Sequence, residues 1–371
     1  MIGSQIILIL ALWLVAASVL GWIVPERWRV PALTACGLGL VGSLSPLSLA
    51  LLLLGTGSSV ALVRRRASPR VLTLFIIVIA LTYGAFLVRA AGQQGWGLPA
   101  AALPLGMAYY VLRLVHYVLE ADRDRLRAHG WQEVLAYQFF PAVLFVGPIN
   151  RFDEFLRDLK RRRWDPELVS QGLGRLLFGA VKIVLIANYL LARKLAPMAD
   201  FAPGSAGQIY ADAILMWTSL YVQFSGYSDI AIGAGAVMGF RLPENFRWPF
   251  LAQNIGDFWR RWHITLSNWC RDYVHKPALA RWRNPLLATT ASMLVLGLWH
   301  EASIHYLLWG LYHALGLTIW RRFAAATAPV YARLSGTGQR SWDVTSGVLT
   351  IHFVIFSYPV VEALQSLIRS S

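Results

Sequence analysis

Long apolar runs alternate with short basic segments along most of the chain. A run of about 20 apolar residues can cross the hydrocarbon core of a bilayer as a helix. The run at residues 32–63 is too long for one straight span, and we expect it to break near Gly55, Thr56 and Gly57. The pattern predicts membrane helices over residues 5–24, 32–63, 71–91, 98–119, 168–195, 209–238, 285–299, 303–322 and 344–368.

Residues 134–149 and 151–164 do not fit this pattern of simple spans. The first segment is apolar but short, and Phe139-Phe140-Pro141 and Gly147-Pro148 interrupt it, so we expect a re-entrant or surface-lying element. The second segment is basic, which predicts an amphipathic cytoplasmic helix beneath the lipid headgroups.

Residues 242–282 mix aromatic, basic and polar side chains with apolar ones. Two faces recur at helical spacing. One consists of Phe258, Trp262, Thr265, Trp269 and Tyr273, and the other of Trp259, His263, Leu266 and Cys270. A helix of this kind suits an element half-buried in the protein, where it lines a cavity from the cytoplasmic side.

Composition supports one integral helical domain over residues 1–371. The chain is 57% hydrophobic and 14% charged, whereas soluble domains carry about 25% charged residues. A net charge of +15 would suggest a nucleic-acid partner in a soluble protein. Here the arginines cluster between apolar runs, as cytoplasmic loops of membrane proteins do. We therefore expect the lipid bilayer as a partner and no nucleic acid.

The basic clusters also predict a topology. Arginines are retained on the cytoplasmic side of a membrane. Alternating the predicted helices between these clusters places the N-terminus inside, residues 93–97 outside and the C-terminus outside. The cytoplasmic clusters are residues 64–66, 157–163, 260–261 and 321–322.

Redox, phosphate-cradle and metal chemistry lack support in the sequence. Cys36 and Cys270 match no disulfide or metal spacing, and we interpret both as structural thiols. No HExxH motif, P-loop or cysteine-histidine cluster occurs in the chain. We expect no metal and no tightly bound cofactor.

His300 is the strongest candidate for chemistry. It ends the stretch Gly297-Leu298-Trp299-His300 and lies between two apolar runs. An ionisable side chain at membrane depth is costly, so it marks a functional site by default. The alternative is a buried histidine that donates to a backbone carbonyl. His263 is the second candidate, and spacing alone does not establish that the two histidines meet.

Three further polar residues lie in or beside the apolar runs. Glu301 follows His300 directly. His305, Trp309 and His313 are spaced four residues apart and would lie on one face of a helix. For His313, packing is as good an explanation as catalysis. Asp229 follows Tyr227 and Ser228 within a predicted span, so it lines a hydrated path or pairs with a cation, for example Arg260 or Arg261.

These residues resemble the membrane-bound O-acyltransferase (MBOAT) family, and its bacterial branch of alginate O-acetyltransferases and teichoic acid D-alanine transfer proteins. The resemblance extends over roughly residues 103–320. The matching stretches are Phe139-Phe140-Pro141, 147–152, 224–230, 239–246, 257–267, Trp269, 271–273, Gly297-Leu298-Trp299-His300 and 308–313.

The resemblance implies an all-α polytopic membrane protein, a helical bundle with a central pore. By motif match, the catalytic histidine is His300 and the second functional histidine is His263. We expect the substrate path to be lined by Trp299, Trp259, Arg260, Trp262, Ser267, Asp229, Tyr227, His313 and Glu301.

The function implied is O-acylation of a cell-envelope polysaccharide by a multi-pass protein of the bacterial inner membrane. The acyl group, expected to be acetyl, would come from acetyl-CoA or from a cytoplasmic acyl carrier. An extracytoplasmic, esterase-like acyl-accepting protein would be the partner. The alternatives are D-alanyl transfer from a carrier protein to a cell-wall polymer, and a non-enzymatic transporter or scaffold. Transporters often contain internal repeats, and the sequence shows none, so we prefer an enzyme to a transporter.

Overall fold

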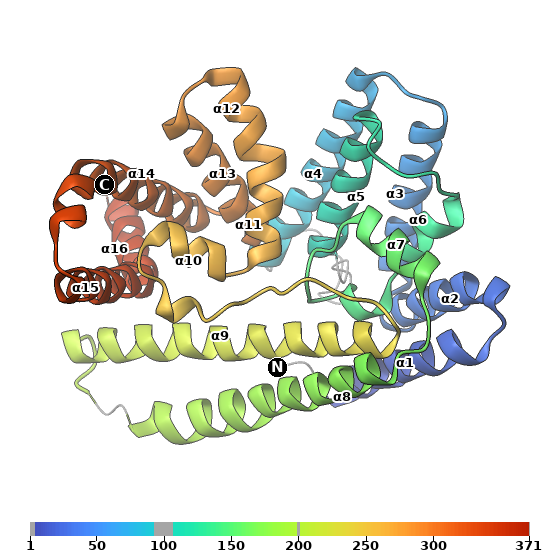
Figure 1. Ribbon diagram of the computed structural model, residues 1–371, viewed down its shortest axis with the longest axis horizontal. Coiled ribbons are helices and arrows are strands. Elements are labelled where there is room, and N and C mark those ends of the chain that lie inside the picture. The colour runs from blue at the N-terminus through green and yellow to red at the C-terminus, as the bar shows by residue number, and fades with distance from the viewer. Residues whose placement is uncertain (1–3, 93–106, 199–200, 371) are drawn as a thin grey trace. The chain divides into compact units, whose positions relative to one another are not determined.

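The computed structural model describes residues 4–92, 107–198 and 201–370, and within these ranges every regular element is helical (Figure 1). This confirms the predicted all-α class. The chain divides into two compact units. The first unit comprises Met1–Ala180 and Gly226–Pro243, and the second comprises Val181–Ser225 and Glu244–Ser371. A single membrane domain over the whole chain stays a prediction. Residues 93–97 and the start of the predicted helix 98–119 lie outside the described ranges.

The first unit contains most of the N-terminal helices. Its elements are α1 (Ser4–Ile23), α2 (Glu26–Leu44), α3 (Pro46–Arg64), α4 (Pro69–Gly92), α5 (Met107–Asp122), α6 (Trp131–Gln138), η2 (Pro141–Val143), α7 (Phe152–Arg161) and α8 (Pro166–Val181).

The predicted helix at residues 32–63 breaks at Ser45, so the prediction of a break at residues 55–57 was wrong. Ser45 is extended, with φ −160° and ψ 103°, and its hydroxyl accepts a hydrogen bond from the Ser48 amide at 3.2 Å. Pro46 then occupies the first position of α3, where its missing N–H costs nothing. Gly55 lies within the helix and packs against the Tyr110 side chain. A Cβ at this position would lie only 2.7 Å from the Tyr110 hydroxyl oxygen, so a glycine is needed for this close contact.

Residues 134–149 are buried in the core of this unit and do not lie on its surface. The short helix α6 ends at Gln138, and buried Arg113 donates to the carbonyls of Tyr137 and Gln138, both at 3.1 Å. The next residues, Phe139 and Phe140, are fully buried. A cation at a helix C-terminus satisfies carbonyls that have no partner within the helix.

The basic stretch at residues 151–164 begins with α7, which confirms an amphipathic helix there, whereas its position beneath cytoplasmic lipid headgroups stays a prediction. Phe152, Phe155 and Leu156 on its apolar face are buried. Phe155 stacks on Phe240 at 5.2 Å between ring centroids, and Phe140 packs on Phe240 at 4.6 Å. Burying each such ring stabilises the fold by roughly 1.5–3 kcal/mol. The apolar face of α7 therefore packs against protein, and its charged face stays exposed.

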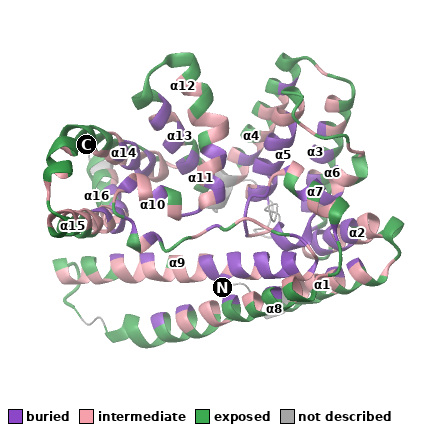
Figure 2. Cartoon of the chain, viewed as in Figure 1, coloured by how far each residue is buried: buried purple, intermediate pink, exposed green. Residues whose placement is uncertain are grey.

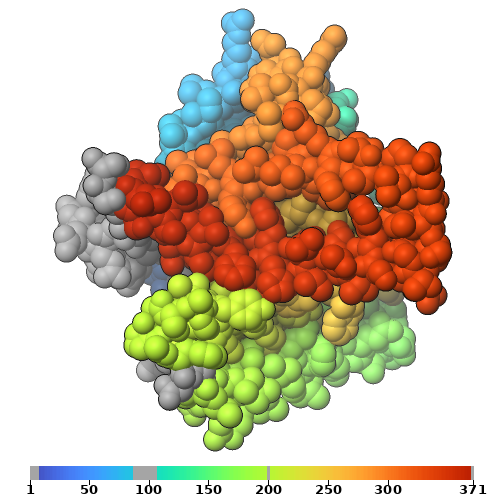
Figure 3. All heavy atoms as spheres, turned by 90° about the vertical axis from the view of Figure 1, so that its left-hand side faces the viewer, coloured from blue at the N-terminus to red at the C-terminus, as the bar shows by residue number. Residues whose placement is uncertain are grey.

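The second unit holds the C-terminal helices and the first part of α9. Its elements are η3 (Lys182–Leu195), η4 (Ala196–Met198), α9 (Ala206–Val237, as far as Ser225), η5 (Pro249–Leu251), α10 (Ile255–Arg261), α11 (Ile264–Cys270), η6 (Arg271–His275), α12 (Lys276–Trp282), α13 (Pro285–His300), α14 (Ile304–Arg333), α15 (Gly336–Ile355) and α16 (Ser357–Ser370). Figure 3 shows α14, α15 and α16 gathered on one face of this unit.

Two of the predicted elements are divided here. The helix predicted at residues 344–368 is two helices, α15 and α16, bent by 43°. Pro359 lies in the first turn of α16. Its ring would clash with the preceding turn of a continuous helix, and it has no N–H to donate to that turn. Residues 242–282 form α10, α11, η6 and α12 instead of one continuous helix.

Helices α13 and α14 form a close antiparallel pair through two glycines. A Cβ at Gly297 would collide with the backbone carbonyl of Tyr306, and one at Gly310 would lie 2.7 Å from the Met293 carbonyl oxygen. The glycines let the two backbones approach each other, as small residues do between membrane helices. This close packing brings the end of α13 beside the first turns of α14.

Three described helical segments are long and apolar enough to cross a membrane, namely Pro46–Arg64, Pro69–Phe86 and Pro166–Met198, and the bent pair α15 and α16 would make a fourth. Leu8–Ile23 and Pro285–His300 are shorter apolar helices. Figure 2 shows many exposed positions along α8. The apolar side chains of Leu173, Leu177 and Phe178 in this helix are exposed. An apolar surface of this kind suits contact with lipid.

Candidate active site

His263 lies at the break between α10 and α11 in the second unit. Its backbone is left-handed, with φ 42° and ψ 56°, and its side chain is 1% exposed. The sequence predicted a continuous helix through this point. Left-handed backbone costs a non-glycine residue roughly 1–2 kcal/mol, so the surrounding structure has to enforce it.

Asn245 holds this break in place. Its backbone carbonyl accepts from the Ile264 amide at 2.9 Å, and its side-chain oxygen accepts from the Thr265 hydroxyl at 2.8 Å. Asn245 is fully buried. Asn245 thus accepts hydrogen bonds from the first turn of α11, and in this way it fixes the direction of the His263 side chain. Sequence reasoning missed this role, although Asn245 lies in the matching stretch 239–246.

The His263 imidazole is surrounded by aromatic rings. Its ring centroid lies 4.7 Å from Phe224, 5.8 Å from Trp299 and 6.4 Å from Phe246. His263 lies outside the apolar segments that could span a membrane. Burial and, to a smaller extent, the nearby His300 imidazole together lower its pKa to about 3. His263 is therefore a neutral imidazole at physiological pH.

His300 ends helix α13, and its side chain is exposed in the described structure, whereas its depth in the membrane stays a prediction. It is exposed because the helix stops directly after it, at extended Glu301. Its ring lies 4.8 Å from Trp299, 5.5 Å from Tyr306 and 5.8 Å from Trp309. The Trp299 indole thus contacts both imidazoles, and it joins His263 and His300 in one site.

His313 continues this cluster along α14. It is fully buried, 4.5 Å from Trp309 and 5.2 Å from Trp259 between ring centroids. Among the residues that the structure describes, neither of its ring nitrogens has a hydrogen-bond partner, and the same holds for the indole nitrogens of Trp259 and Trp309. Buried polar groups are normally satisfied, so these nitrogens form a set of free hydrogen-bonding groups inside the unit.

We call the rings of Trp259, His263, Trp299, His300, Tyr306, Trp309 and His313 the histidine cluster. Sequence reasoning did not select Tyr306, whose hydroxyl pairs with that of Tyr358 at 2.7 Å. Its spacing from Trp309 and His313 on α14 is the signal that would have found it. Glu301 is half-buried next to His300.

Three other predicted site residues lie in the second unit but have different surroundings. Trp262 stacks on Phe258 at 5.6 Å, and the Ser267 hydroxyl donates to the Trp262 carbonyl at 3.2 Å. Arg260 is exposed and pairs with Asp257 at 3.5 Å. Trp262 and Ser267 thus support the helix break, and Arg260 is a surface cation.

Asp229 and Tyr227 belong to the first unit, whereas the histidine cluster lies in the second. The Asp229 carboxylate is buried and accepts from Nε of Arg175 at 2.6 Å. The suggested pairing with Arg260 or Arg261 was wrong, because both of these arginines contact Asp257. Arg175 of α8 was not singled out from the sequence. The glycines Gly172 and Gly179 bring α8 close to α9, where the pair forms.

Replacing Asp229 by asparagine should destabilise the protein. The change leaves the Arg175 guanidinium without this counter-charge, and breaking an ion pair inside a protein is strongly unfavourable. Because the Arg175 side chain is 34% exposed, solvent screening reduces the loss to roughly 1–2 kcal/mol. The unfolding midpoint in detergent measures it. Asp212→Asn, on the same helix but exposed, is the matched control, and equal midpoints for the two variants would contradict a structural ion pair.

No group of three or more histidine, cysteine, aspartate or glutamate side chains in the described residues could hold a metal ion. Cys36 and Cys270 are buried and free. The chemistry that the cluster can offer is that of imidazoles and ring N–H groups, which transfer protons and stabilise developing negative charge.

Comparisons with known proteins identify the family of this chain. The model of the membrane-bound O-acyltransferase (MBOAT) family matches residues 69–337. A probable alginate O-acetylase, AlgI, of Pseudomonas fluorescens is 33% identical over 315 residues, which is 81% of this chain and 59% of that protein. The peptidoglycan O-acetyltransferase of Helicobacter pylori is 30% identical over 72% of this chain and 56% of its own length.

A teichoic acid D-alanyltransferase of Bacillus subtilis is similar as well, with 29% identity over 68% of this chain and 67% of that protein. The chain spans a little under three fifths of the length of the alginate O-acetylases that it matches. The family match covers all three histidines of the cluster and well over half of the chain. The protein therefore belongs to the membrane-bound O-acyltransferase family.

Proposed function

We propose that this protein is an O-acyltransferase that moves an acyl group, acetyl in our first choice, from a cytoplasmic thioester to an extracytoplasmic hydroxyl, for O-acylation of a cell-envelope polysaccharide. The observation that carries the proposal is the histidine cluster. An exposed imidazole, His300, and a buried one, His263, lie against the same indole of Trp299. Relatives named for alginate and peptidoglycan O-acetylation support the choice of acetyl and of polysaccharide.

In the proposed reaction, the neutral His300 imidazole removes the proton from the attacking hydroxyl. The alkoxide oxygen forms a bond to the thioester carbonyl carbon, and the negative charge moves to the carbonyl oxygen. When that tetrahedral intermediate collapses, the carbon–sulfur bond breaks, and the thiolate takes up the proton held by the imidazolium. Donors that stabilise the oxyanion contribute to such reactions.

The buried ring nitrogens of the cluster suit the other polar atoms of the substrate. Trp259 and Trp309 offer N–H donors, and His313 offers one donor and one acceptor. A thioester or a sugar hydroxyl that entered here would satisfy groups that otherwise remain unpaired, at a free-energy gain of about 1–3 kcal/mol each. We assign these three residues to substrate positioning.

The donor in this proposal is acetyl-CoA or an acyl thioester on a carrier protein, reached from the cytoplasm. The acceptor side needs an extracytoplasmic partner, an esterase-like protein with a nucleophilic hydroxyl that passes the group to the polysaccharide. The protein would be a multi-pass protein of the bacterial inner membrane, which also agrees with the basic clusters and apolar helices of the chain.

D-alanyl transfer from a carrier protein to a cell-wall polymer is the second candidate, because a teichoic acid D-alanyltransferase is among the similar proteins. The chemistry at the histidines would be the same, since both donors are thioesters. A transporter or an inactive scaffold of the same fold would bind ligands without cleaving a thioester.

Membranes of the native host that contain the full-length protein, its extracytoplasmic partner and the polysaccharide distinguish these functions. Radiolabelled acetyl-CoA and a D-alanyl-charged carrier protein are supplied in turn, and label in polysaccharide and free thiol are measured together. We expect thiol release with acetyl-CoA and transfer of label to polysaccharide. Release with the D-alanyl carrier alone would establish the second candidate. Absence of thiol release with either donor, in vesicles with folded protein and polysaccharide, would refute an acyltransferase.

Topology provides a separate prediction. Single cysteines at Arg65, Arg161 and Arg322, all exposed in the structure, should react with a membrane-impermeant maleimide only from the cytoplasmic side. A cysteine at Gln94 should react only from outside. Buried Cys36 and Cys270 are replaced by serine in the background. Labelling of the Arg161 position from outside alone would overturn this topology.

A further inference from the structure

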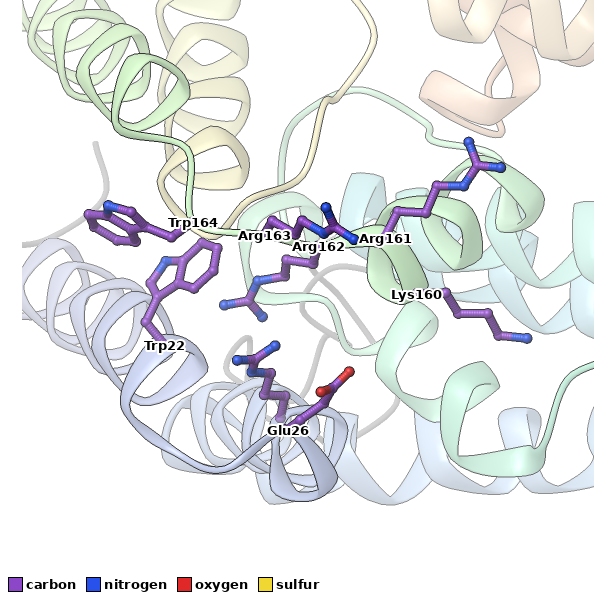
Figure 4. A pocket seen from close by; sticks show the side chains of 8 residues that line it. Trp22, Glu26, Lys160, Arg161, Arg162, Arg163 and Trp164 are labelled. Atoms are coloured by element: carbon purple, nitrogen blue, oxygen red, sulfur yellow. The ribbon is translucent and has the colours of Figure 1, made fainter.

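A second candidate site lies in the first unit, apart from the residues of the histidine cluster. It is a pocket of about 1030 Å³ between the loop that follows α7 and the connection of α1 to α2 (Figure 4). Its lining carries five cations and one carboxylate. The lining residues are Trp22, Glu26, Arg29, Lys160, Arg161, Arg162, Arg163 and Trp164.

Arg162 is built into this pocket and is not a flexible surface side chain. It is only 7% exposed. Its guanidinium lies 4.0 Å from the centroid of the Trp22 ring, and Nη2 donates to the Gly21 carbonyl at 2.6 Å. Gly239, with φ +85°, makes room for the stem, because a Cβ there would lie 2.9 Å from Arg162 Cγ. The fold thus places one cation at a defined position.

The positive charge in the pocket is not balanced by the described protein. Nε and Nη1 of Arg162 and Nε of Arg29 are buried without a hydrogen-bond partner among the described residues, and within those residues neither arginine has a carboxylate at ion-pair distance. The nearby acids Asp158 and Asp165 contact Arg241, at 2.9 and 3.1 Å. A buried cation without a counter-charge is costly, which favours an anion in its place.

Burial and, to a smaller extent, the positive charge of Arg29 together lower the pKa of Arg162 to about 10. Arg162 is still protonated at neutral pH, so its positive charge and that of Arg29 face one pocket. Figure 4 shows Arg162 extending from its loop toward Trp22 and Glu26, whereas Lys160 and Arg161 point away. An anion that accepts from both guanidinium groups would relieve the repulsion and satisfy the free N–H groups.

The surroundings indicate which anion this is. Trp22 lies in the last turn of apolar α1, and the Trp22 and Trp164 rings contact each other edge to face at 5.2 Å. Tryptophan and arginine at the end of an apolar helix are typical of the membrane–water interface. Arginine forks match the geometry of phosphate oxygens. The contacts of Arg162 with Gly21 and Trp22 place the end of α1 on the side of the basic cluster at residues 157–163, which does not agree with a spanning α1 whose N-terminus is inside. Basic pockets between helices on the cytoplasmic side hold phospholipid headgroups.

We infer that this pocket binds a phosphate group, held by the guanidinium groups of Arg162 and Arg29 beside Trp22, with an anionic phospholipid of the membrane as its source. A soluble phosphate ester would present the same chemistry, so the test includes both sources. The inference does not depend on the proposed acyl transfer, because no residue of the histidine cluster lines the pocket.

The test uses purified full-length protein in detergent micelles. Phosphatidylglycerol, a galactolipid without phosphate, inorganic phosphate and adenosine 3′,5′-bisphosphate are titrated separately, and binding is followed by native mass spectrometry and by the unfolding midpoint. Arg29→Gln removes one guanidinium and leaves the Arg162–Trp22 contact in place. Arg27→Gln is the matched control, since Arg27 is exposed on the same helix and does not line the pocket.

We expect phosphatidylglycerol to bind and the galactolipid not to bind. Arg29→Gln should weaken phosphatidylglycerol binding about tenfold or more, as expected for a lost charge-assisted hydrogen bond, whereas Arg27→Gln should change it less than about twofold. Arg162→Lys, which keeps the charge but loses the fork, should also weaken binding. The same dependence with adenosine 3′,5′-bisphosphate alone would support the phosphate site and assign it to a soluble ester. Equal binding by Arg29→Gln and Arg27→Gln, for every phosphate probe, would overturn the inference.

Discussion

Acyl transfer by the His300→Ala variant should fall by about a hundred- to ten-thousand-fold, the usual contribution of a general base. His300 is exposed at the end of its helix, so the variant should fold, insert and bind donor as the wild type does. The measurement is label in polysaccharide and free thiol in vesicles with matched protein content. Donor binding, followed separately, shows whether the loss lies in the chemical step.

His352→Ala is the control for this change. His352 belongs to the same unit but contacts Tyr210 and lies outside the histidine cluster. Its removal should leave acyl transfer near the wild-type rate. Wild-type transfer by His300→Ala would eliminate the proposed mechanism and would leave His300 as a surface histidine in a protein that conducts or scaffolds.

The His263→Asn variant should lose acyl transfer by about a hundredfold or more, with only a small loss of stability. Asparagine tolerates the left-handed backbone that His263 adopts, so the change removes the imidazole without adding strain. His263→Ala should lose a similar amount of activity and in addition roughly 1–2 kcal/mol of stability, because alanine does not tolerate this conformation. Thermal unfolding in detergent separates the two effects.

If His263 and His300 act as one unit through Trp299, their losses should not add. The double variant His263→Asn/His300→Ala should then be little slower than the more damaging single variant, since catalytic groups that cooperate are non-additive. Losses that multiply would show that His263 and His300 act independently and would contradict a shared site.

Much of the helical layout could be predicted from the sequence. The observed bounds of α1, α4, α9 and α13 lie within a few residues of the predicted ones. The amphipathic pattern at residues 151–164 predicted a helix there, although not that its apolar face packs against protein. Both features depend on residues close together in the chain, because a helix with one apolar face repeats its pattern over every turn or two. The candidate histidines could be found for the same reason, since a polar residue between apolar runs is a local signal.

Only the tertiary structure decided where the helices break, which partners the buried polar groups take and which histidine is exposed. The break at His263 depends on Asn245, and the partner of Asp229 is Arg175, which is 54 residues away in the chain. A periodic pattern carries no information about such distant contacts. They form because the few close approaches that glycines allow, such as that of Gly297 to Tyr306, determine which side chains meet.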